Sequence, residues 1–207
     1  PQIVRFSVVV IMVVFIYILF SVFLRPGNSE YSYHFSREEG SVTILSATLL
    51  STAGLLSVAS FFISSFRDIR LKIFFFVLAL GLMYFALDEM LHFHEMLGDW
   101  LDQTGFLRII FTETSIRRWN DLLVILYGII ALPVLICFLP TAFKIPLLGE
   151  FFIVAFTSYA LHTAIDSIIE PPTDLSRIIE ESFKLYTGLF LTLGSGTGLF
   201  YILDLKS

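Results

Sequence analysis

The chain has 207 residues, of which 57% are hydrophobic and 15% are charged. A soluble domain usually carries about 25% charged residues, so this composition argues against a soluble globular domain. The formal net charge of −5 argues against nucleic acid as a partner. The single cysteine, Cys137, excludes an intrachain disulfide and any cysteine-based metal motif.

The hydrophobic residues gather in long apolar runs. A helix of about 20 apolar residues crosses the roughly 30 Å hydrocarbon core of a bilayer, and a helix satisfies its own backbone hydrogen bonds in lipid. We therefore predict an all-α fold, a polytopic transmembrane helix bundle that forms one domain over residues 1–207 and has the lipid bilayer as its partner. Six spans are expected, at about residues 3–24, 42–66, 73–97, 121–139, 150–169 and 175–203.

The first and last of these spans carry additional signals. The run over residues 3–24 is too long for the hydrophobic region of a signal peptide and has no small-residue cleavage site, so we expect it to be a retained span. The last span contains glycines at four positions, Gly188, Gly194, Gly196 and Gly198. Small residues let helices approach closely in lipid. We expect them to support packing inside the bundle, and a contact in a dimer is the alternative.

An even number of spans places both termini on the same side of the membrane. Lysine and arginine are evenly divided, six on each side, with Lys184 inside the last span. On the side of the termini these residues lie in short loops, such as the turn over residues 67–72. This placement favours cytoplasmic termini under the positive-inside rule.

Ionisable residues interrupt the second half of the third span. In a continuous helix, a spacing of four, three and four residues places side chains on one face. Four residues have this spacing: Asp88, His92, Glu95 and Asp99. His94 is expected to point away from this face. Glu89 and His92 also form a Glu-x-x-His pair, the spacing found on two helices of di-iron carboxylate bundles.

The fifth and sixth spans bring further ionisable groups to the same membrane face. His162 and Asp166 are four residues apart and share a helix face. On the last span, Glu180 and Glu181 are followed by Lys184. The end of the third span, the end of the fifth and the start of the sixth all reach one side of the membrane, so these groups are expected to converge there.

Such a cluster needs charge compensation. An ionisable group at membrane depth costs roughly 2.5–3.5 kcal/mol on insertion scales, so these groups normally pair inside the bundle. A divalent metal or shared protons would relieve the repulsion between the carboxylates, and mixed carboxylate and imidazole ligands suit Fe, Zn, Mn or Cu. The predicted metal ligands are Asp88, His92, Glu95, His162 and Asp166. Glu89 and Glu181 are the candidates for a further ligand or a general base.

These residues lead to several functional hypotheses. The first is an integral membrane metalloprotein with this site at one membrane face, acting as a metal-dependent oxidoreductase or hydrolase. The alternative is a non-catalytic accessory subunit of a larger membrane complex, whose polar face meets other membrane subunits. A third is a proton or cation pathway, although the first, second and fourth spans offer almost no polar groups at mid-membrane depth. Each group of residues also has a purely structural interpretation. The stripe on the third span would then be a solvated helix face, and His162 and Asp166 would be a structural pair within one helix.

The ionisable segments also show resemblances. The string Leu87-Asp88-Glu89-Met90-Leu91-His92-Phe93-His94-Glu95 and the later Ile178-Ile179-Glu180-Glu181 resemble uncharacterised bacterial multipass membrane proteins with an Asp-Glu…His-Glu helix and a later Glu-Glu helix. This resemblance covers the third to sixth helices and carries no function. Asp88 and His92 are also similar to the Asp-x3-His metal pair of the C subunit of copper membrane monooxygenases, but Gly105 stands where that family has its later histidine. We expect an integral protein of a bacterial or archaeal cytoplasmic membrane.

Overall fold

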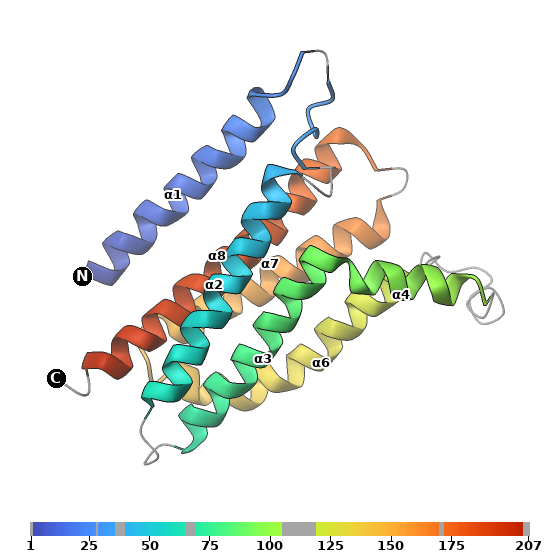
Figure 1. The fold of residues 1–207 in the computed structure, drawn as a ribbon. Coiled ribbons are helices and arrows are strands. Elements are labelled where there is room, and N and C mark those ends of the chain that lie inside the picture. The colour runs from blue at the N-terminus through green and yellow to red at the C-terminus, as the bar shows by residue number, and fades with distance from the viewer. Residues whose placement is uncertain are drawn as a thin grey trace.

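The computed structural model describes residues 2–27, 29–35, 40–64, 69–104, 119–169 and 172–204. In these ranges the chain forms seven α-helices and no strand, so the predicted all-α fold is confirmed (Figure 1). The helices are α1 (Gln2–Phe23), α2 (Ser41–Ile63), α3 (Ile69–Leu91), α4 (Phe93–Asp102), α6 (Trp119–Ala142), α7 (Leu148–Ile168) and α8 (Asp174–Asp204).

Six of these helices, all except α4, are long and apolar enough to cross a membrane. Large apolar side chains such as Val9, Phe62 and Ile130 are exposed on their outer faces, where lipid would cover them. The prediction of about six spans is confirmed, and the arrangement is compatible with an integral membrane protein. The third span is shorter than expected: α3 ends at Leu91, and the chain continues in a new direction as α4 (Figure 1).

Helix α8 lies at the centre of the bundle. It packs along α2 and α7, and α2 in turn packs along α3, whereas α6 contacts α7 and the short α4. Helix α1 lies at the edge, with limited contact to α2 and α8 (Figure 1). Leu185 and Leu189 of α8 are fully buried. The position of α8 therefore depends on close contacts with several neighbours at once.

The glycines of α8 make these close contacts possible. A Cβ atom on Gly188 would lie 3.2 Å from a side-chain carbon of α2, and one on Gly194 would lie 3.2 Å from the ring of Phe152 on α7. A Cβ atom on Gly198 would lie 2.5 Å from the ring of Phe75 on α3. The glycines thus face three neighbouring helices of the same chain, which confirms the expected packing inside the bundle.

Hydroxyl groups add polar contacts between α2 and α8. Thr192 Oγ1 donates a hydrogen bond to the carbonyl oxygen of Leu49, at 2.8 Å. Ser57 Oγ lies 3.1 Å from Ser195 Oγ. Interhelical hydrogen bonds of this kind help hold helices together in a membrane. Lipid tails are as apolar as the side chains of a neighbouring helix, so burial of apolar surface does not by itself favour contact between helices.

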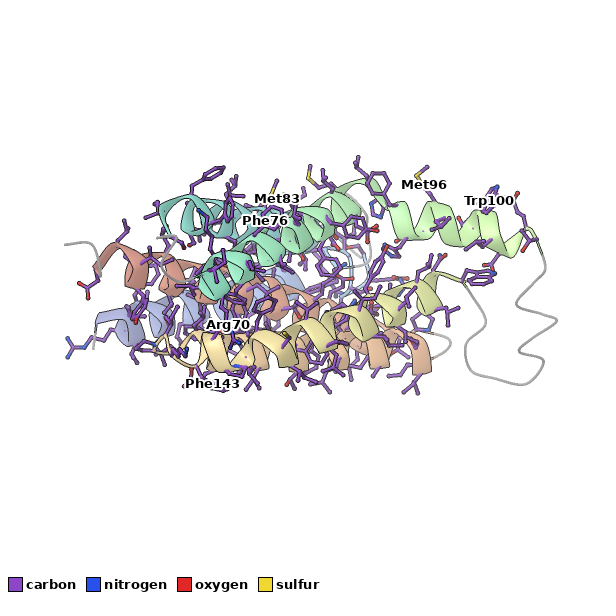
Figure 2. The ribbon with its side chains drawn as sticks, turned by 90° about the horizontal axis from the view of Figure 1, so that it is seen from below. Arg70, Phe76, Met83, Met96, Trp100 and Phe143 are labelled. Carbon is purple, nitrogen blue, oxygen red and sulfur yellow. The ribbon has the colours of Figure 1, made fainter. Side chains whose placement is uncertain are left out.

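The two ends of the bundle differ in chemistry. At the end where α3 begins, aromatic rings pack together, with Phe74 5.0 Å from Phe75, 5.6 Å from Phe138 and 5.6 Å from Phe152 between ring centroids. Figure 2 shows Arg70 near this end, and Trp100 of α4 at the opposite end. The ionisable residues singled out in the sequence lie toward the α4 end.

We predict that Gly198→Ala destabilises the protein and that Gly81→Ala does not. Phe75 is fully buried, so its ring has little room to move away from a new methyl group, and overpacking of this kind costs about 1–3 kcal/mol. A Cβ atom on Gly81 would meet nothing within 4 Å, so the same substitution there only improves helix propensity. Thermal unfolding in detergent measures both variants. Equal melting temperatures for the two variants would contradict the packing described here.

Candidate functional site

A single residue interrupts the helix that carries the ionisable stripe. His92 has φ 53° and ψ 39°, the left-handed conformation, between the end of α3 and the start of α4. Backbone hydrogen bonds continue across it: the His92 N–H donates to the Asp88 carbonyl at 2.7 Å, and the Met96 N–H donates to the His92 carbonyl at 2.9 Å. A non-glycine residue in this conformation costs on the order of 1–3 kcal/mol, so surrounding contacts must hold it.

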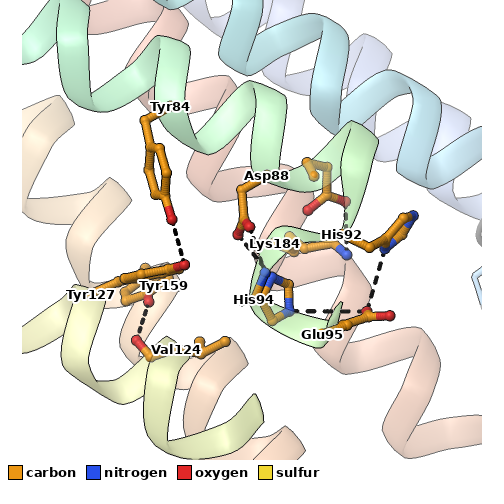
Figure 3. A network of polar contacts seen from close by, with 10 residues as sticks. Tyr84, Asp88, His92, His94, Glu95, Val124, Tyr127, Tyr159 and Lys184 are labelled. Atoms are coloured by element: carbon orange, nitrogen blue, oxygen red, sulfur yellow. Dashed lines mark hydrogen bonds and ion pairs between the residues drawn. The ribbon is translucent and has the colours of Figure 1, made fainter. Parts of the chain in front are cut away.

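Asp88 supplies those contacts. Its Oδ1 accepts a hydrogen bond from the backbone N–H of His94 at 2.9 Å, and its Oδ2 lies 2.8 Å from His94 Nδ1 (Figure 3). The N–H groups in the first turn of a helix have no partner within the helix, so the buried Asp88 caps α4 as well as pairing with the imidazole. The expectation that His94 points away from Asp88 is wrong, because the break at His92 changes the direction of every side chain after it.

The charge of Asp88 also affects the ionisation of His94, which lies outside the membrane-spanning segments. Burial alone would lower the pKa of His94. The hydrogen bond to Asp88 and the negative charges of Asp88, Glu95 and Glu89 outweigh burial and raise the pKa above its ordinary value of 6.5. The ion pair therefore contributes fully below pH 6.5, and its contribution is lost as the pH rises through the raised pKa.

His92 and Glu95 form a separate pair at the outer side of the break. His92 Nδ1 lies 3.4 Å from Glu95 Oε1, and the Glu95 side chain is 44% exposed. His94 Nε2 lies 3.9 Å from the same oxygen (Figure 3). The continuous four-residue stripe expected on the third span is not formed. Asp88 lies before the break, His92 is the residue at the break, and Glu95 and Asp99 follow it on α4.

Lys184 joins α3 to α8 inside the bundle. Its Nζ lies 2.9 Å from Glu89 Oε1 on α3 and 2.9 Å from Glu181 Oε1 on α8. The three side chains are largely buried, with 22%, 14% and 12% of the surface of Lys184, Glu89 and Glu181 exposed. The two residues predicted as further ligand or general base are therefore brought together, but with an ammonium group between them.

His162 of α7 turns toward α8. Its Nδ1 donates to the backbone carbonyl of Glu180 at 3.3 Å and lies 3.8 Å from Glu180 Oε1. Asp166, its predicted partner on the same helix, is exposed and interacts electrostatically with Glu180 and Glu181. The contact that holds His162 is thus between helices, and it connects α7 to the same segment of α8 that carries Lys184.

The groups from these helices form one electrostatic cluster, which we call the α8 cluster. His162 interacts electrostatically with Lys184 and His94, and Glu181 interacts with Glu89 and Asp166. We define it as five carboxylates, one lysine and two histidines: Asp88, Glu89, Asp166, Glu180, Glu181, Lys184, His94 and His162. Two further charged residues interact with its members, Glu95 with His94 and Arg177 with Glu180.

The α8 cluster is not a preformed metal site in this arrangement. Within the described ranges, no three His, Cys, Asp or Glu residues stand close enough together to hold a metal ion. The ammonium of Lys184 lies between two of the candidate ligands. Oε2 of Glu181 is buried and has no hydrogen-bond partner among the residues that the structure describes.

Three tyrosines surround the cluster and attach α6 to it. Tyr84 of α3 and Tyr127 of α6 share a hydrogen bond of 2.7 Å between their hydroxyl groups, and Tyr159 of α7 donates to the Val124 carbonyl at 2.6 Å (Figure 3). The ring of Tyr127 lies 6.5 Å from the imidazole of His94. Tyr127 and Tyr159 were not predicted from the sequence, because nothing in their local pattern separates them from other aromatic residues of the spans.

These observations define the class of the protein: a multipass helical bundle with membrane-spanning character and an ionisable cluster at one end. The chain belongs to the family described as domain of unknown function DUF8692, which matches residues 5–195 and so includes the whole cluster. The expected resemblance to proteins without an assigned function is thereby confirmed. No curated protein and no solved structure matches the chain.

We predict that Asp88→Asn lowers the pKa of His94, because the substitution removes the adjacent negative charge while burial remains. Histidine side-chain NMR in detergent between pH 5 and pH 9 measures the titration. His34, which contacts Leu24 and Ser41 away from this break, is the internal control. Its signals are expected to be the same in the wild type and in the variant at each pH. An unaltered titration of His94 would show that Asp88 is not its ionic partner.

Proposed function

We propose that the protein is an integral membrane metalloprotein whose divalent cation binds in the α8 cluster. The observation that carries this proposal is the charge imbalance of the cluster. The cluster holds five carboxylates, of which Asp166 alone is exposed. Lys184, a protonated His94 and Arg177, whose charge acts on Glu180, supply three positive charges. Buried carboxylates without compensation are strongly unfavourable, and a divalent cation would supply the missing positive charge.

The donor types support the same proposal. Imidazole and carboxylate together suit Fe, Zn, Mn or Cu. Of the predicted ligands, Asp88, His162 and Asp166 belong to the α8 cluster. Glu180, which His162 contacts between α7 and α8, is a further carboxylate donor beside them. Glu89 or Glu181 would act as a further ligand or as a general base.

Burial argues against the alternative of a solvated polar face. Glu89 and Glu181 expose only 14% and 12% of their side-chain surfaces, and both contact Lys184. The buried, unpartnered Oε2 of Glu181 is an acceptor for which a cation or a proton is the natural partner. His92 and Glu95, by contrast, lie on the outer side of the break, so their predicted role as ligands is the part of the proposal that needs a separate test.

The chemistry of such a site indicates which activities to assay. A metal held by carboxylates and imidazoles activates water or dioxygen. Metal-dependent hydrolysis and oxidation are therefore the two reaction classes that fit the proposal. Assays for hydrolysis and for oxidation would be carried out once a bound metal has been demonstrated.

The proposed orientation places the cluster on the outer face of a bacterial or archaeal cytoplasmic membrane. The start of α1 and the end of α8 lie at the end of the bundle away from α4 (Figure 1). Cytoplasmic termini, which the short basic loops favour, would put the α8 cluster on the opposite, extracytoplasmic side.

Elemental analysis of the protein purified in mild detergent without chelator tests the proposal. We expect about one or two equivalents of Fe, Zn, Mn or Cu in the wild type and loss of that metal in the double variant His162→Ala, Glu181→Gln. The matched comparison is His92→Ala, which removes an imidazole of the outer pair and is expected to retain the metal. Size-exclusion chromatography confirms that each variant is folded.

Two results would contradict the proposal. A wild type without metal, or equal metal content in the wild type and the double variant, removes the metalloprotein hypothesis. The remaining hypothesis would then be an accessory subunit, which predicts that the protein purifies with other membrane subunits. Loss of metal from His92→Ala alone would assign the outer pair to the site.

A further inference from the structure

Helix α4 differs from the other helices in length and in direction. It has ten residues, Phe93–Asp102, and a rise of about 1.5 Å per residue gives it a length of roughly 15 Å. That length is about half the thickness of the hydrocarbon core, so α4 cannot cross a membrane. The break at His92 also turns it out of the axis of α3 (Figure 1). The chain therefore places a short helix at the end of the bundle that carries the α8 cluster.

One flank of α4 is held by the protein. His94 Nδ1 lies 2.8 Å from Asp88 Oδ2 on α3. One helical turn later Gly98 is buried, and a Cβ atom there would meet Asn120 of α6. Residues four apart share a face of a helix. These two contacts therefore fix how α4 is turned about its own axis.

The rest of the helix surface divides into two flanks of different chemistry. The first, which we call the apolar flank, has the spacing of three, one and three residues that places side chains on one helix face. It consists of Phe93, Met96, Leu97 and Trp100, which are 43%, 65%, 46% and 61% exposed. The second, which we call the acidic flank, consists of Glu95, Asp99 and Asp102, at a spacing of four and three residues. Asp99 and Asp102 are exposed, and Glu95 exposes 44% of its side chain.

The exposed apolar surface of α3 leads directly into the apolar flank. Helix α3 is long and apolar enough to span a membrane, and Met90 and Leu91 at its end are exposed. Phe93, the first member of the apolar flank, follows just after the break. Figure 2 shows Met83 of α3 and Met96 of α4 on the same side of the molecule. Lipid that covers the exposed side chains of α3 would therefore reach the apolar flank without interruption.

We propose that α4 is an interfacial helix whose apolar flank lies in lipid at the boundary between headgroups and acyl chains, while its acidic flank faces water. Amphipathic helices of this kind lie in the plane of the membrane, with the apolar face about 5–10 Å into this boundary. Tryptophan is enriched at the same level, which fits Trp100. The inference requires the bundle to sit in a bilayer, but it does not depend on a bound metal.

The alternative occupant of the apolar flank is a second copy of the chain. Two copies of α4 packed on this flank would bring two acidic flanks together, and α4 carries no Lys or Arg to compensate them. Like charges placed across an interface disfavour association. Lipid covers the apolar flank and leaves the carboxylates in water, so the charge distribution favours lipid.

The first experiment measures the depth of Trp100 by fluorescence quenching in phosphatidylcholine vesicles, with lipid in large excess. The chain has two tryptophans, so Trp119→Phe leaves Trp100 as the only one. Lipids brominated in the upper part of the acyl chain or near its end quench from two depths, and iodide quenches from water. We expect the shallow bromines to quench Trp100 at least about twofold more than the deep ones, because the apolar flank would lie only about 5–10 Å into the boundary.

Two further single-tryptophan variants, both made with Trp100→Phe and Trp119→Phe, serve as matched controls. Asp99→Trp places the reporter on the acidic flank of the same helix, where we expect quenching by iodide and not by the brominated lipids. Ile130→Trp places it within α6, where the native side chain is 61% exposed and where the deep bromines are expected to quench most.

Two results would overturn the inference. Trp100 quenched by iodide and by neither brominated lipid would place the apolar flank in water. Trp100 protected from all three quenchers would place the flank under protein, as in a contact with a second copy. In both cases, deep quenching of the Ile130→Trp reporter would show that the bundle itself is in the bilayer.

A second measurement leaves both tryptophans in place. In a Cys137→Ser background, which has no other cysteine, Met96→Cys and Asp99→Cys each carry a nitroxide label on one flank of α4. We expect the label at position 96 to be more accessible to oxygen, which dissolves in lipid. The label at position 99 is expected to be more accessible to a water-soluble nickel chelate. Equal accessibility at the two positions would contradict the inference, because the two flanks would then share one environment.

Discussion

The ammonium of Lys184, held between Glu89 and Glu181, links α3 to α8, two helices that both pack along α2. Each of these charges would cost several kcal/mol to bury alone, and removal of a single partner leaves an uncompensated charge. At the other end of the same two helices, Gly198 lies against the ring of Phe75 with no room for a Cβ atom. A polar contact at one end and a steric contact at the other thus join α3 and α8, while α2, which packs along both, lies between them in the order of helix contacts.

The break at His92 extends this arrangement to α4 and α6. Since α4 leaves the axis of α3 (Figure 1), Gly98 can lie against α6, where a Cβ atom would come within 2.8 Å of the backbone nitrogen of Asn120. The same break brings His94 to Asp88. Asp88 therefore has a structural role as the cap of α4, and any chemistry assigned to its carboxylate has to be compatible with that role.

The sequence allowed the prediction of the spans and of the face on which the ionisable groups meet. An apolar run of about 20 residues indicates a span without any knowledge of its neighbours, and the alternating direction of successive spans places their ends on one side or the other. The glycines of α8 likewise indicated close packing before the contacts with Phe75 and Phe152 were known.

The pairing within the site could not be predicted in the same way. Helical periodicity assumes a continuous helix, and the segment Leu91-His92-Phe93 has no glycine or proline to signal a break, so the positions of His92 and His94 depended on tertiary structure. His162 was paired with Asp166 because both lie on one helix, whereas its contact is Glu180 on the next helix. For Lys184, the spacing from Glu181 was visible in the sequence, but the contact with Glu89 was not.

The charges of the α8 cluster lie at one end of the bundle. Between Lys184 and Asp204, α8 carries no Asp, Glu, Lys, Arg or His, and α2, which packs along it, carries none over Ser41–Ile63. The hydroxyl groups in this region contact helix carbonyls or each other, as Thr192 and Ser57 do. Proton transfer across a membrane uses chains of Asp, Glu and His, and the described segments of α2 and α8 beyond Lys184 do not continue the α8 cluster with such residues until Asp204. Phenylalanine rings fill the opposite end of the bundle. On α2 and α8, the Asp, Glu, Lys, Arg and His residues are therefore confined to the end near α4, apart from Asp204.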